Sequence, residues 1–333
     1  MPELPEVETV RRGLADLLPG RTIKTARQID SPKSFPNADA DVKQFMIGAK
    51  VLLVKRRAKV LLIELSSKYS LVIHLKMTGQ LVFVGDRTEI ANPKLSEYTL
   101  QGGAPVAFGS QPTAATASDK LGLTISVGDV PERFGAGHPN ESLIGELPDR
   151  STRAIIEFDD GSHLYFNDQR KFGWVKLMPT LEVPNIDFMK KVGPEPLEAD
   201  FTAREFHDRF KRRARTNIKA ALLDQTVIAG VGNIYADESL WGAKIDPRRL
   251  VSDLSDAEFK LLYQELRAVM NLAIEKGGST DRNYVNAEGK RGSYMDFARV
   301  FRREGKACPR CGHTIEKIRH AGRGTHFCPN CQK

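Results

Sequence analysis

Hydrophobic and polar positions follow two different patterns along the chain. In the N-terminal part, short segments rich in apolar and β-branched residues predict strands at 21–28, 50–55, 60–65, 71–74, 154–158 and 163–167. From Thr202 onward, apolar residues recur every three or four positions and predict helices at 203–213, 218–223, 234–241 and 256–276. We therefore expect a strand-rich domain followed by a helical domain.

A further helix is expected close to the N-terminus. Pro5 suits the first turn of a helix. Apolar residues follow it at helical spacing, namely Val7, Val10, Leu14 and Leu17. Glu3 would therefore lie at the positive end of this helix, with Glu6 on the same face three residues later.

The composition is typical of a globular protein that works in a reducing compartment. With 333 residues, of which 41% are hydrophobic, the chain can bury the cores of two domains. No apolar run approaches the roughly 20 residues that span a bilayer, and the acidic N-terminus does not resemble a signal peptide. All four cysteines fall within the last 26 residues, so they are too clustered to stabilise a secreted fold with disulfide bonds. We expect a cytoplasmic protein with no membrane partner.

Charge is distributed unevenly. Residues 1–200 carry 25 Lys+Arg against 26 Asp+Glu, whereas residues 201–333 carry 25 against 16, so the whole net charge of +8 comes from the C-terminal part. Such a basic region predicts a polyanionic partner and strongly salt-dependent binding. Residues 85–150 are rich in Gly, Pro, Ala, Ser and Thr and hold 5 Lys+Arg against 9 Asp+Glu. We expect loop or partial disorder there, with one strand at 121–127, held away from a polyanion.

The four cysteines form two Cys-x-x-Cys pairs separated by sixteen residues: Cys308, Cys311, Cys328 and Cys331. Four thiolates with this spacing predict one closed, tetrahedral, structural Zn²⁺ site. The alternative, a redox dithiol, lacks the surrounding βαβ pattern. Because four sulfur atoms complete the site, we expect His313, His320 and His326 to be surface or packing residues.

Pro2 is a candidate nucleophile. Removal of Met1 would leave it with a secondary α-amine, and α-amino groups have a pKa of about 7.7 to 8.0, so part of the amine is unprotonated at neutral pH. Such an amine can add to the C1′ carbon of a sugar and form an iminium. Glu3 beside it could carry protons. The alternative is that Glu3, Glu6 and Glu8 only complement the helix dipole.

These features resemble formamidopyrimidine-DNA glycosylases, bifunctional base-excision enzymes with an N-terminal proline nucleophile. The opening Met-Pro-Glu-Leu-Pro-Glu-Val-Glu-Thr-Val looks like the start of that family. Residues 222–240, with Gly230-Val231-Gly232-Asn233 between two predicted helices, are similar to its helix-two-turn-helix. The resemblance covers nearly the whole chain. It implies an α+β fold with an N-terminal β-sandwich and flanking helices, a helical helix-two-turn-helix domain, and a C-terminal zinc-binding β-hairpin.

The resemblance also implies a division into domains. The catalytic β-sandwich domain would span 1–192, with 85–150 as an atypical insertion. A linker at 193–201 would follow. The two prolines and the glycine between Val192 and Glu198 support this linker independently of the resemblance. The helix-two-turn-helix domain, including a lesion-covering loop, would span 202–299, and the zinc finger 300–333.

The catalytic group implied by the family consists of Pro2 as nucleophile and Glu3 as proton carrier, together with Glu6, Lys59 and Arg323. Lys59 falls at a turn between two predicted strands, where the family's lysine reaches the DNA and the lesion. Without the resemblance, a solvated basic turn would be the preferred interpretation. Arg323 would lie at the tip of the hairpin and hold phosphates beside the everted nucleotide.

Three further side chains would fill the space that an everted base leaves: Met77, Arg170 and Phe172. In the family the arginine meets the orphaned cytosine and the phenylalanine wedges between bases, which helps to keep a base extruded. Lys171 would contact phosphate. Gln169 stands where a proline is common, and Lys171 where an arginine is frequent, so the shape of this loop and its phosphate contact should differ slightly from those of relatives.

The remaining DNA contacts lie in the helical domain. Lys219, Asn233 and Arg323 are expected to bind phosphates. Thr280 and Tyr284 belong to a glycine-rich stretch that covers the everted purine in the family. In the N-terminal domain the insertion displaces a His-containing phosphate contact, and only Arg153 is available to replace it.

The implied function is removal of 8-oxoguanine and formamidopyrimidines opposite cytosine from double-stranded DNA, followed by β,δ-elimination at the abasic site. The enzyme would be both a glycosylase and an AP lyase, a monomer, without an organic cofactor, and associated with the nucleoid when bound to DNA. One alternative is an endonuclease VIII-like enzyme for oxidised pyrimidines. Those relatives typically begin Pro-Glu-Gly-Pro-Glu and lack the Arg-x-Phe loop. The other is a DNA-binding protein without catalysis, against which Pro2, Glu3, Glu6 and Lys59 together argue.

Overall fold

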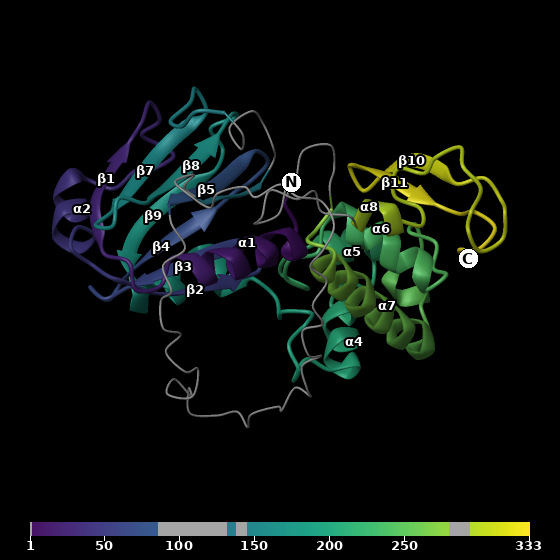
Figure 1. Ribbon diagram of the computed structural model, residues 1–333. Coiled ribbons are helices and arrows are strands. Elements are labelled where there is room, and N and C mark those ends of the chain that lie inside the picture. The colour runs from purple at the N-terminus through teal and green to yellow at the C-terminus, as the bar shows by residue number, and fades with distance from the viewer. Residues whose placement is uncertain (1, 86–131, 138–144, 280–293) are drawn as a thin grey trace, which may run out of the picture.

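A computed structural model describes residues 2–85, 132–137, 145–279 and 294–333. Figure 1 shows the strands of the N-terminal part gathered on one side and the helices of the C-terminal part on the other, with the hairpin at the far end of the helices. This arrangement confirms the expected α+β fold, with N-terminal sheets, a helical domain and a C-terminal hairpin.

Two antiparallel sheets make up the N-terminal part. One has five strands in the order β1-β7-β8-β5-β6 and the other four in the order β2-β3-β4-β9. The strand bounds are β1 (Ile23–Gln28), β2 (Val51–Arg57), β3 (Val60–Leu65), β4 (Tyr69–His74), β5 (Gly79–Gly85), β6 (Glu132–Gly137), β7 (Thr152–Phe158), β8 (His163–Asp168) and β9 (Trp174–Pro179). Their apolar side chains form one large buried cluster.

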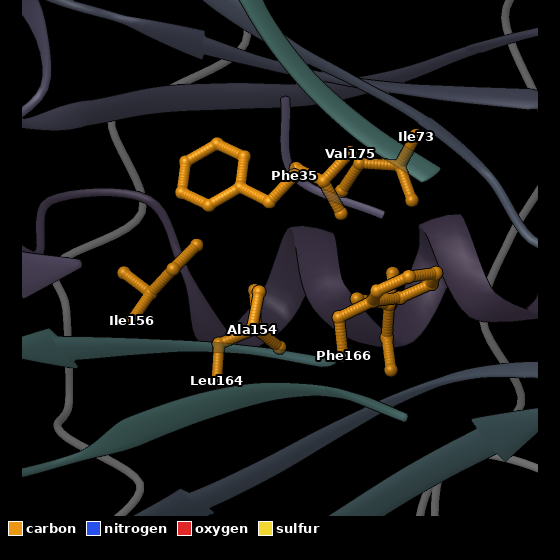
Figure 2. A pocket seen from close by; sticks show the side chains of 8 residues that line it. Phe35, Ile73, Ala154, Ile156, Leu164, Phe166 and Val175 are labelled. Atoms are coloured by element: carbon orange, nitrogen blue, oxygen red, sulfur yellow. The ribbon is translucent and has the colours of Figure 1, made fainter. Parts of the chain in front are cut away.

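The interior of the sandwich is almost completely filled. Figure 2 shows the residues around a small apolar cavity, whose volume is about 10 Å³. A space of this size holds at most one water molecule, and its lining offers nothing for a water to bind. Side chains from both sheets line it, among them Ile73 and Val175 from one sheet and Leu164 and Phe166 from the other. The sandwich therefore serves as a rigid support.

Helix α1 (Leu4–Leu17) joins the two parts of the molecule. Val7, Val10 and Leu14 pack in the sandwich core, whereas Leu4 belongs to the core of the helical part. A capping box between Glu3 and Glu6 begins the helix. The N-terminal turn of α1 is consequently fixed to both cores at once.

The helical part contains α4 (Ala203–Lys211), α5 (Ile218–Leu223), α6 (Asn233–Gly242), η3 (Val251–Asp253), α7 (Asp256–Glu275) and α8 (Tyr294–Phe297). A capping box of Ser255 and Glu258 starts α7, the longest of the described helices. The strands β10 (Glu316–His320) and β11 (Arg323–Phe327) form the C-terminal hairpin. Its two-residue turn, Ala321 and Gly322, has positive φ at both positions, as a tight hairpin with matching strand twist requires.

The predicted elements that fall on described residues are all present, with ends that differ by a few residues. The sequence pattern missed several others: β5, β9, α2 (Asp39–Phe45), η2 (Thr180–Asn185), α3 (Asp187–Lys191), η3, α8 and β6. The strand β6 lies inside the segment interpreted as loop, where it pairs with β5 and extends the five-stranded sheet. The strand expected at 121–127 falls outside the described residues. No helix in the described part of the chain is long and apolar enough to cross a membrane.

The close packing between the sheets makes core and surface leucines respond differently to truncation. Leu164 is 2% exposed and Leu181 is 87% exposed. We expect Leu164→Ala to lower the free energy of unfolding by about 2–5 kcal/mol, because the cavity cannot collapse, and Leu181→Ala to change it by less than about 0.5 kcal/mol. Urea unfolding followed by circular dichroism measures both values. Equal effects of the two substitutions would contradict the role of the sandwich as a rigid support.

Candidate functional site

The N-terminal turn of α1 lies against the loop that precedes α6. The backbone N–H of Leu4 donates to the carbonyl oxygen of Gly230 at 3.0 Å. Gly230 has φ +79°, and a Cβ there would lie 2.5 Å from the Cβ of Leu4. Both the backbone conformation and the close approach therefore require glycine. This contact places Pro2 and Glu3 against the helical part.

Glu3 is a buried carboxyl group next to the candidate nucleophile. Its Oε1 accepts a hydrogen bond of 3.1 Å from the backbone N–H of Ile234, and its Oε2 has no hydrogen-bond partner among the described residues. Burial raises the pKa of Glu3 to about 7, with Glu6 adding to the increase while Lys59 and the Ile234 N–H oppose it. A pKa near neutral makes both protonation states of the carboxyl accessible, so it can both give and accept a proton.

Glu6 holds Glu3 in place and reaches two other elements. Its Oε2 accepts from the backbone N–H of Glu3 at 2.8 Å. Its Oε1 accepts from the hydroxyl of Tyr235 at 2.5 Å and from the backbone N–H and hydroxyl of Ser279 at 2.9 and 3.0 Å. Ser279 immediately precedes residues 280–293, so Glu6 ties α1 to α6 and to the stem of that segment.

Lys59 enters the same site from the turn between β2 and β3. Its Nζ donates to the carbonyl oxygen of Val231 at 2.9 Å, and the side chain is buried. Burial lowers the pKa of Lys59, although the charges of Glu3 and Glu6 counteract this and Arg323 adds to it. The structure thus brings Glu3, Glu6 and Lys59 together around one loop.

The turn that carries Lys59 is anchored by Glu195. This carboxylate accepts from the backbone N–H of Ala58 at 2.5 Å and from the guanidinium groups of Arg56 and Arg57 at 2.7 and 2.9 Å. Arg56 also pairs with Glu8 of α1 at 3.0 Å. Burial alone would raise the pKa of Glu8, but its arginine partners lower it to about 2. The network links α1, the lysine turn and the segment after α3.

Asp168 organises the loop between β8 and β9. Its carboxylate accepts from the hydroxyl of Thr78, from the backbone N–H of Arg170 at 3.1 Å and from that of Gly173 at 2.6 Å. A Cβ on Gly173 would lie 2.9 Å from the ring of Phe166 and 3.0 Å from the Asp168 carboxylate. The loop is therefore tightly closed behind its exposed side chains.

Met77, Arg170 and Phe172 lie next to one another at this loop. The Nη1 of Arg170 lies 3.0 Å from the Sδ of Met77, and its Cζ lies 4.8 Å from the centre of the Phe172 ring. Met77 and Phe172 are among the most exposed large apolar side chains of the described residues. Lys171 turns away from the three and pairs with Asp30 at 3.0 Å. An exposed cluster of two apolar groups and a guanidinium suits contact with nucleobases better than with water.

Arg153 differs from what the sequence suggested, and His74 is a partly buried group that the sequence analysis did not single out. Arg153 is buried and donates to the backbone carbonyl oxygens of Asp168, Thr152 and Arg150, so it does not present its guanidinium as a substitute phosphate contact. His74 was not predicted. Burial lowers its pKa to about 3, with the charges of Lys76 and Lys59 contributing, and its Nδ1 accepts from the Lys76 N–H at 3.0 Å. The signal that could have revealed it is its position three residues before Met77.

Lys219, Asn233 and Arg323 meet at the junction of α5, α6 and the hairpin. Lys219 is buried, where its Nζ pairs with Asp237 at 2.6 Å and donates to the hydroxyl of Thr325 at 2.7 Å. Asn233 donates to the carbonyl oxygen of Gly324 at 2.9 Å. Arg323 is exposed at the start of β11. Of the three, Lys219 therefore faces protein rather than the surface.

The four cysteines form a compact cluster of sulfur atoms. All four Sγ atoms lie within 4.8 Å of one another, with Cys308 and Cys331 3.9 Å apart and Cys311 and Cys328 3.6 Å apart. Zinc–sulfur bonds of about 2.3 Å in a tetrahedron place the sulfurs about 3.8 Å apart, so the residues fit Zn²⁺. His326 is buried against Asp237 and is not part of the cluster.

Thr280 and Tyr284, the two residues expected to cover a lesion, lie outside the described residues. So does Met1.

Comparison with known proteins gives a consistent result over the whole chain. A family model described as the formamidopyrimidine-DNA glycosylase N-terminal domain matches residues 1–175, and the H2TH domain of the same glycosylase matches 192–284. A zinc finger found in FPG and IleRS matches 305–333. The formamidopyrimidine-DNA glycosylase of Pelotomaculum thermopropionicum is 38% identical over 334 residues, which cover 100% of this chain and 99% of that protein.

Solved structures agree with this match. The complex of a Lactococcus lactis FPG variant with DNA containing Fapy-dG has a TM-score of 0.75 and 31% identity, and covers 100% of both chains. The complex of Lactococcus lactis Fpg with DNA containing an abasic site has the same TM-score and identity and covers 99% of both chains. Both similarities extend over the sandwich, the helices and the hairpin.

The raised pKa of Glu3 predicts a pH dependence of stability. Its pKa is 4.5 ordinarily and about 7 here, so the folded protein binds this proton more tightly than the unfolded chain does. The stabilisation is fully present below pH 4.5 and is lost as the pH rises through 7. Glu3→Gln, which mimics the protonated carboxyl, should therefore become more stable than the wild type as the pH rises across this range. Urea unfolding across the range measures this difference, and a difference that is independent of pH would contradict the assignment.

Proposed function

The chain belongs to the formamidopyrimidine-DNA glycosylase family and is a base-excision repair DNA glycosylase, and we propose that it removes oxidised purines through a Schiff base on Pro2. The observation that supports this proposal best is Glu3, a buried carboxyl group with a pKa of about 7 beside the proline. The substrates we propose are 8-oxoguanine and formamidopyrimidines opposite cytosine.

In the proposed reaction the Pro2 amine attacks C1′ while protonated Glu3 delivers its proton to the sugar, which expels the base. As the C1′–N bond forms, two bonds at C1′ break. The glycosidic bond breaks and the base leaves with the proton that the amine loses, and the C1′–O4′ bond breaks and its oxygen takes the Glu3 proton, which leaves the iminium. The resulting iminium acidifies the C2′ proton, which allows β-elimination and then δ-elimination. A carboxyl group with a pKa near the working pH suits both the delivery and the later removal of protons.

Glu6 and Lys59 support this chemistry in our proposal. Glu6 fixes the backbone of Glu3 through its 2.8 Å hydrogen bond. Lys59 places a positive charge beside the two carboxyl groups and keeps the pKa of Glu3 from rising further. When DNA is bound, we expect the Lys59 ammonium to exchange the Val231 carbonyl for a phosphate or lesion oxygen, with Arg323 beside it.

We propose that Met77, Arg170 and Phe172 fill the space left by the everted nucleotide. Arg170 has donors for the exposed edge of the orphaned cytosine, and Phe172 is placed to wedge between bases. Lys171 would release Asp30 and bind phosphate. Asn233 and Arg323 are the proposed phosphate contacts of the helical part. Because Lys219 is buried, we propose that it holds the hairpin in position and reaches phosphate only if the hairpin moves.

The zinc ion contributes structure rather than chemistry. When it is bound, the four cysteines fill its coordination sphere, and the ion holds the two knuckles together. The protein then presents Arg323 from the hairpin beside Lys59. No organic cofactor enters the proposed reaction.

We also propose the domain division expected from the sequence: 1–192, 193–201, 202–299 and 300–333. Its main support is that α3 ends at Lys191 and α4 begins at Ala203, with neither helix nor strand between them. A monomer in the cytoplasm, associated with the nucleoid when bound to DNA, is the state we propose. The clustered cysteines suit a reducing compartment.

Two other functions predict different results. An endonuclease VIII-like enzyme would excise thymine glycol in preference to 8-oxoguanine, whereas a protein without catalysis would bind DNA and leave both strands intact. The exposed Arg170 and Phe172 favour the purine-excising enzyme, because that loop offers contacts to an orphaned cytosine. Parallel excision assays on the two duplexes distinguish these functions.

The Schiff base predicts a covalent complex that can be trapped. With borohydride and an 8-oxoguanine:cytosine duplex, we expect the wild type to form a reduced adduct at Pro2, because borohydride reduces the iminium to a stable amine. The adduct should be greatly weakened in Pro2→Gly. Gel electrophoresis and mass spectrometry of the adduct and of the N-terminus measure both. If a wild type whose N-terminus is confirmed as Pro2 forms no adduct, the proline mechanism is wrong for this lesion.

The contact between Gly232 and Glu3 predicts that a single methyl group slows excision. A Cβ at Gly232 would lie 2.2 Å from the Glu3 Cδ, whereas its φ of −134° is open to alanine. Gly232→Ala should therefore fold but displace the carboxyl, lowering single-turnover excision by about 100-fold. Zinc content and the affinity for undamaged DNA serve as controls and should not change. Normal excision by this variant would show that Gly232 does not set the position of Glu3.

A further inference from the structure

One face of α6 contacts the C-terminal hairpin and the cysteine knuckles along its whole length. Asn233, Asp237 and Trp241 are four residues apart and therefore lie on the same side of the helix. Asn233 donates to the Gly324 carbonyl at 2.9 Å, and Asp237 accepts from the backbone N–H of His326 at 2.9 Å. Trp241 completes this row, because its indole Nε1 lies 3.4 Å from the Sγ of Cys308 and donates to it.

Two guanidinium groups lie against the Trp241 ring. The Cζ of Arg310 lies 3.8 Å from the ring centre, and that of Arg299 lies 5.2 Å from it. Arg310 belongs to the knuckle between Cys308 and Cys311, and its Nη2 donates to the Gly242 carbonyl at 3.2 Å. Trp241 itself is 7% exposed. The ring thus contacts two guanidinium groups, and its one polar atom is directed at a cysteine sulfur.

This geometry has a chemical consequence for a zinc-bound cysteine. An indole N–H can only donate, and a buried one needs an acceptor. A zinc-bound cysteine is a thiolate, whose negative charge strengthens the hydrogen bonds that it accepts. The bond from Trp241 therefore favours the deprotonated form that holds the metal. Partners of this kind, one shell beyond the ligands, orient the ligands and strengthen metal binding.

We propose that Trp241 is the outer hydrogen-bond donor of the zinc centre, which keeps Cys308 bound to the ion and fixes the knuckle to α6. Without this bond, Cys308 would more readily leave the zinc and become open to chelators and thiol reagents. Because the same helix begins with Asn233, a loaded zinc site also sets the position of the hairpin relative to the N-terminus of α6.

The test compares two identical substitutions at the two tryptophans of the chain. Trp241→Phe keeps an aromatic ring beside the arginines but removes the N–H, whereas Trp174→Phe makes the same change on β9. Zinc release from the full-length, zinc-loaded protein to a chromophoric chelator is followed by absorbance. We expect release from Trp241→Phe to be faster by about tenfold and release from Trp174→Phe to match the wild type. Equal release from Trp241→Phe and the wild type would overturn the proposal.

A second measurement does not depend on how well a variant folds. The protein is loaded with the NMR-active isotope of cadmium in place of zinc, and its tryptophan indole nitrogens are isotope-labelled. A hydrogen bond through sulfur transmits a scalar coupling between the indole proton and the metal. We expect one of the two indole signals to show this coupling and Trp241→Phe to remove that signal. A wild type in which neither indole proton couples to cadmium would refute the proposal, because simple packing of the ring gives no coupling.

Discussion

The N-terminal turn of α1 is the constraint on which the site depends. A helix that begins in one hydrophobic core and continues in another cannot shift along its axis without exposing apolar surface in both. Leu4 is buried in the helical core and Val7 in the sandwich core, only three residues apart. The hydrogen bond from Leu4 to Gly230 and the absence of a side chain at Gly232 then fix where Glu3 lies. Pro2 precedes this anchored turn directly, so its position follows from the packing of both domains.

Around this turn, burial has a larger effect on the pKa of Glu3 than the neighbouring positive charge does. A buried carboxyl group near a cation usually stays ionised. Here Lys59 opposes the rise in the pKa of Glu3, but burial and the nearby Glu6 outweigh it. Glu8, five residues after Glu3, shows the opposite balance, because arginines outweigh burial there and lower its pKa to about 2. Two acidic residues of one helix thus receive different protonation states from their partners, as proton transfer at one of them requires.

The sequence predicted those features that depend on local pattern. For α7, the sequence shows both the helical spacing of apolar residues and the capping residues Ser255 and Glu258. The strand β5 was missed because it is buried on both faces and so lacks an alternating pattern. The short helix α2 buries only Val42, which gives too weak a period to detect. The contacts at the site are even harder to predict from the sequence, because Lys59 and Val231 are 172 positions apart and a local motif cannot show that they are in contact. The zinc cluster was predictable, since spacing alone specifies it.

The net charge of the helical domain does not show which of its basic residues are available to bind a partner. The C-terminal part carries the positive charge of the chain, but Lys219 is neutralised by Asp237 beneath the hairpin. Replacing one member of such a buried pair leaves an uncompensated charge, so the pair is an obligatory unit of the structure rather than part of the binding surface. Asp237 also accepts a hydrogen bond from the backbone N–H of His326. The positive charge of Lys219 therefore helps to hold the hairpin instead of contributing to the surface. The position of the exposed Arg323 therefore depends on a buried ion pair. A count of basic residues cannot distinguish a lysine that holds the structure together from an arginine that is available to bind DNA.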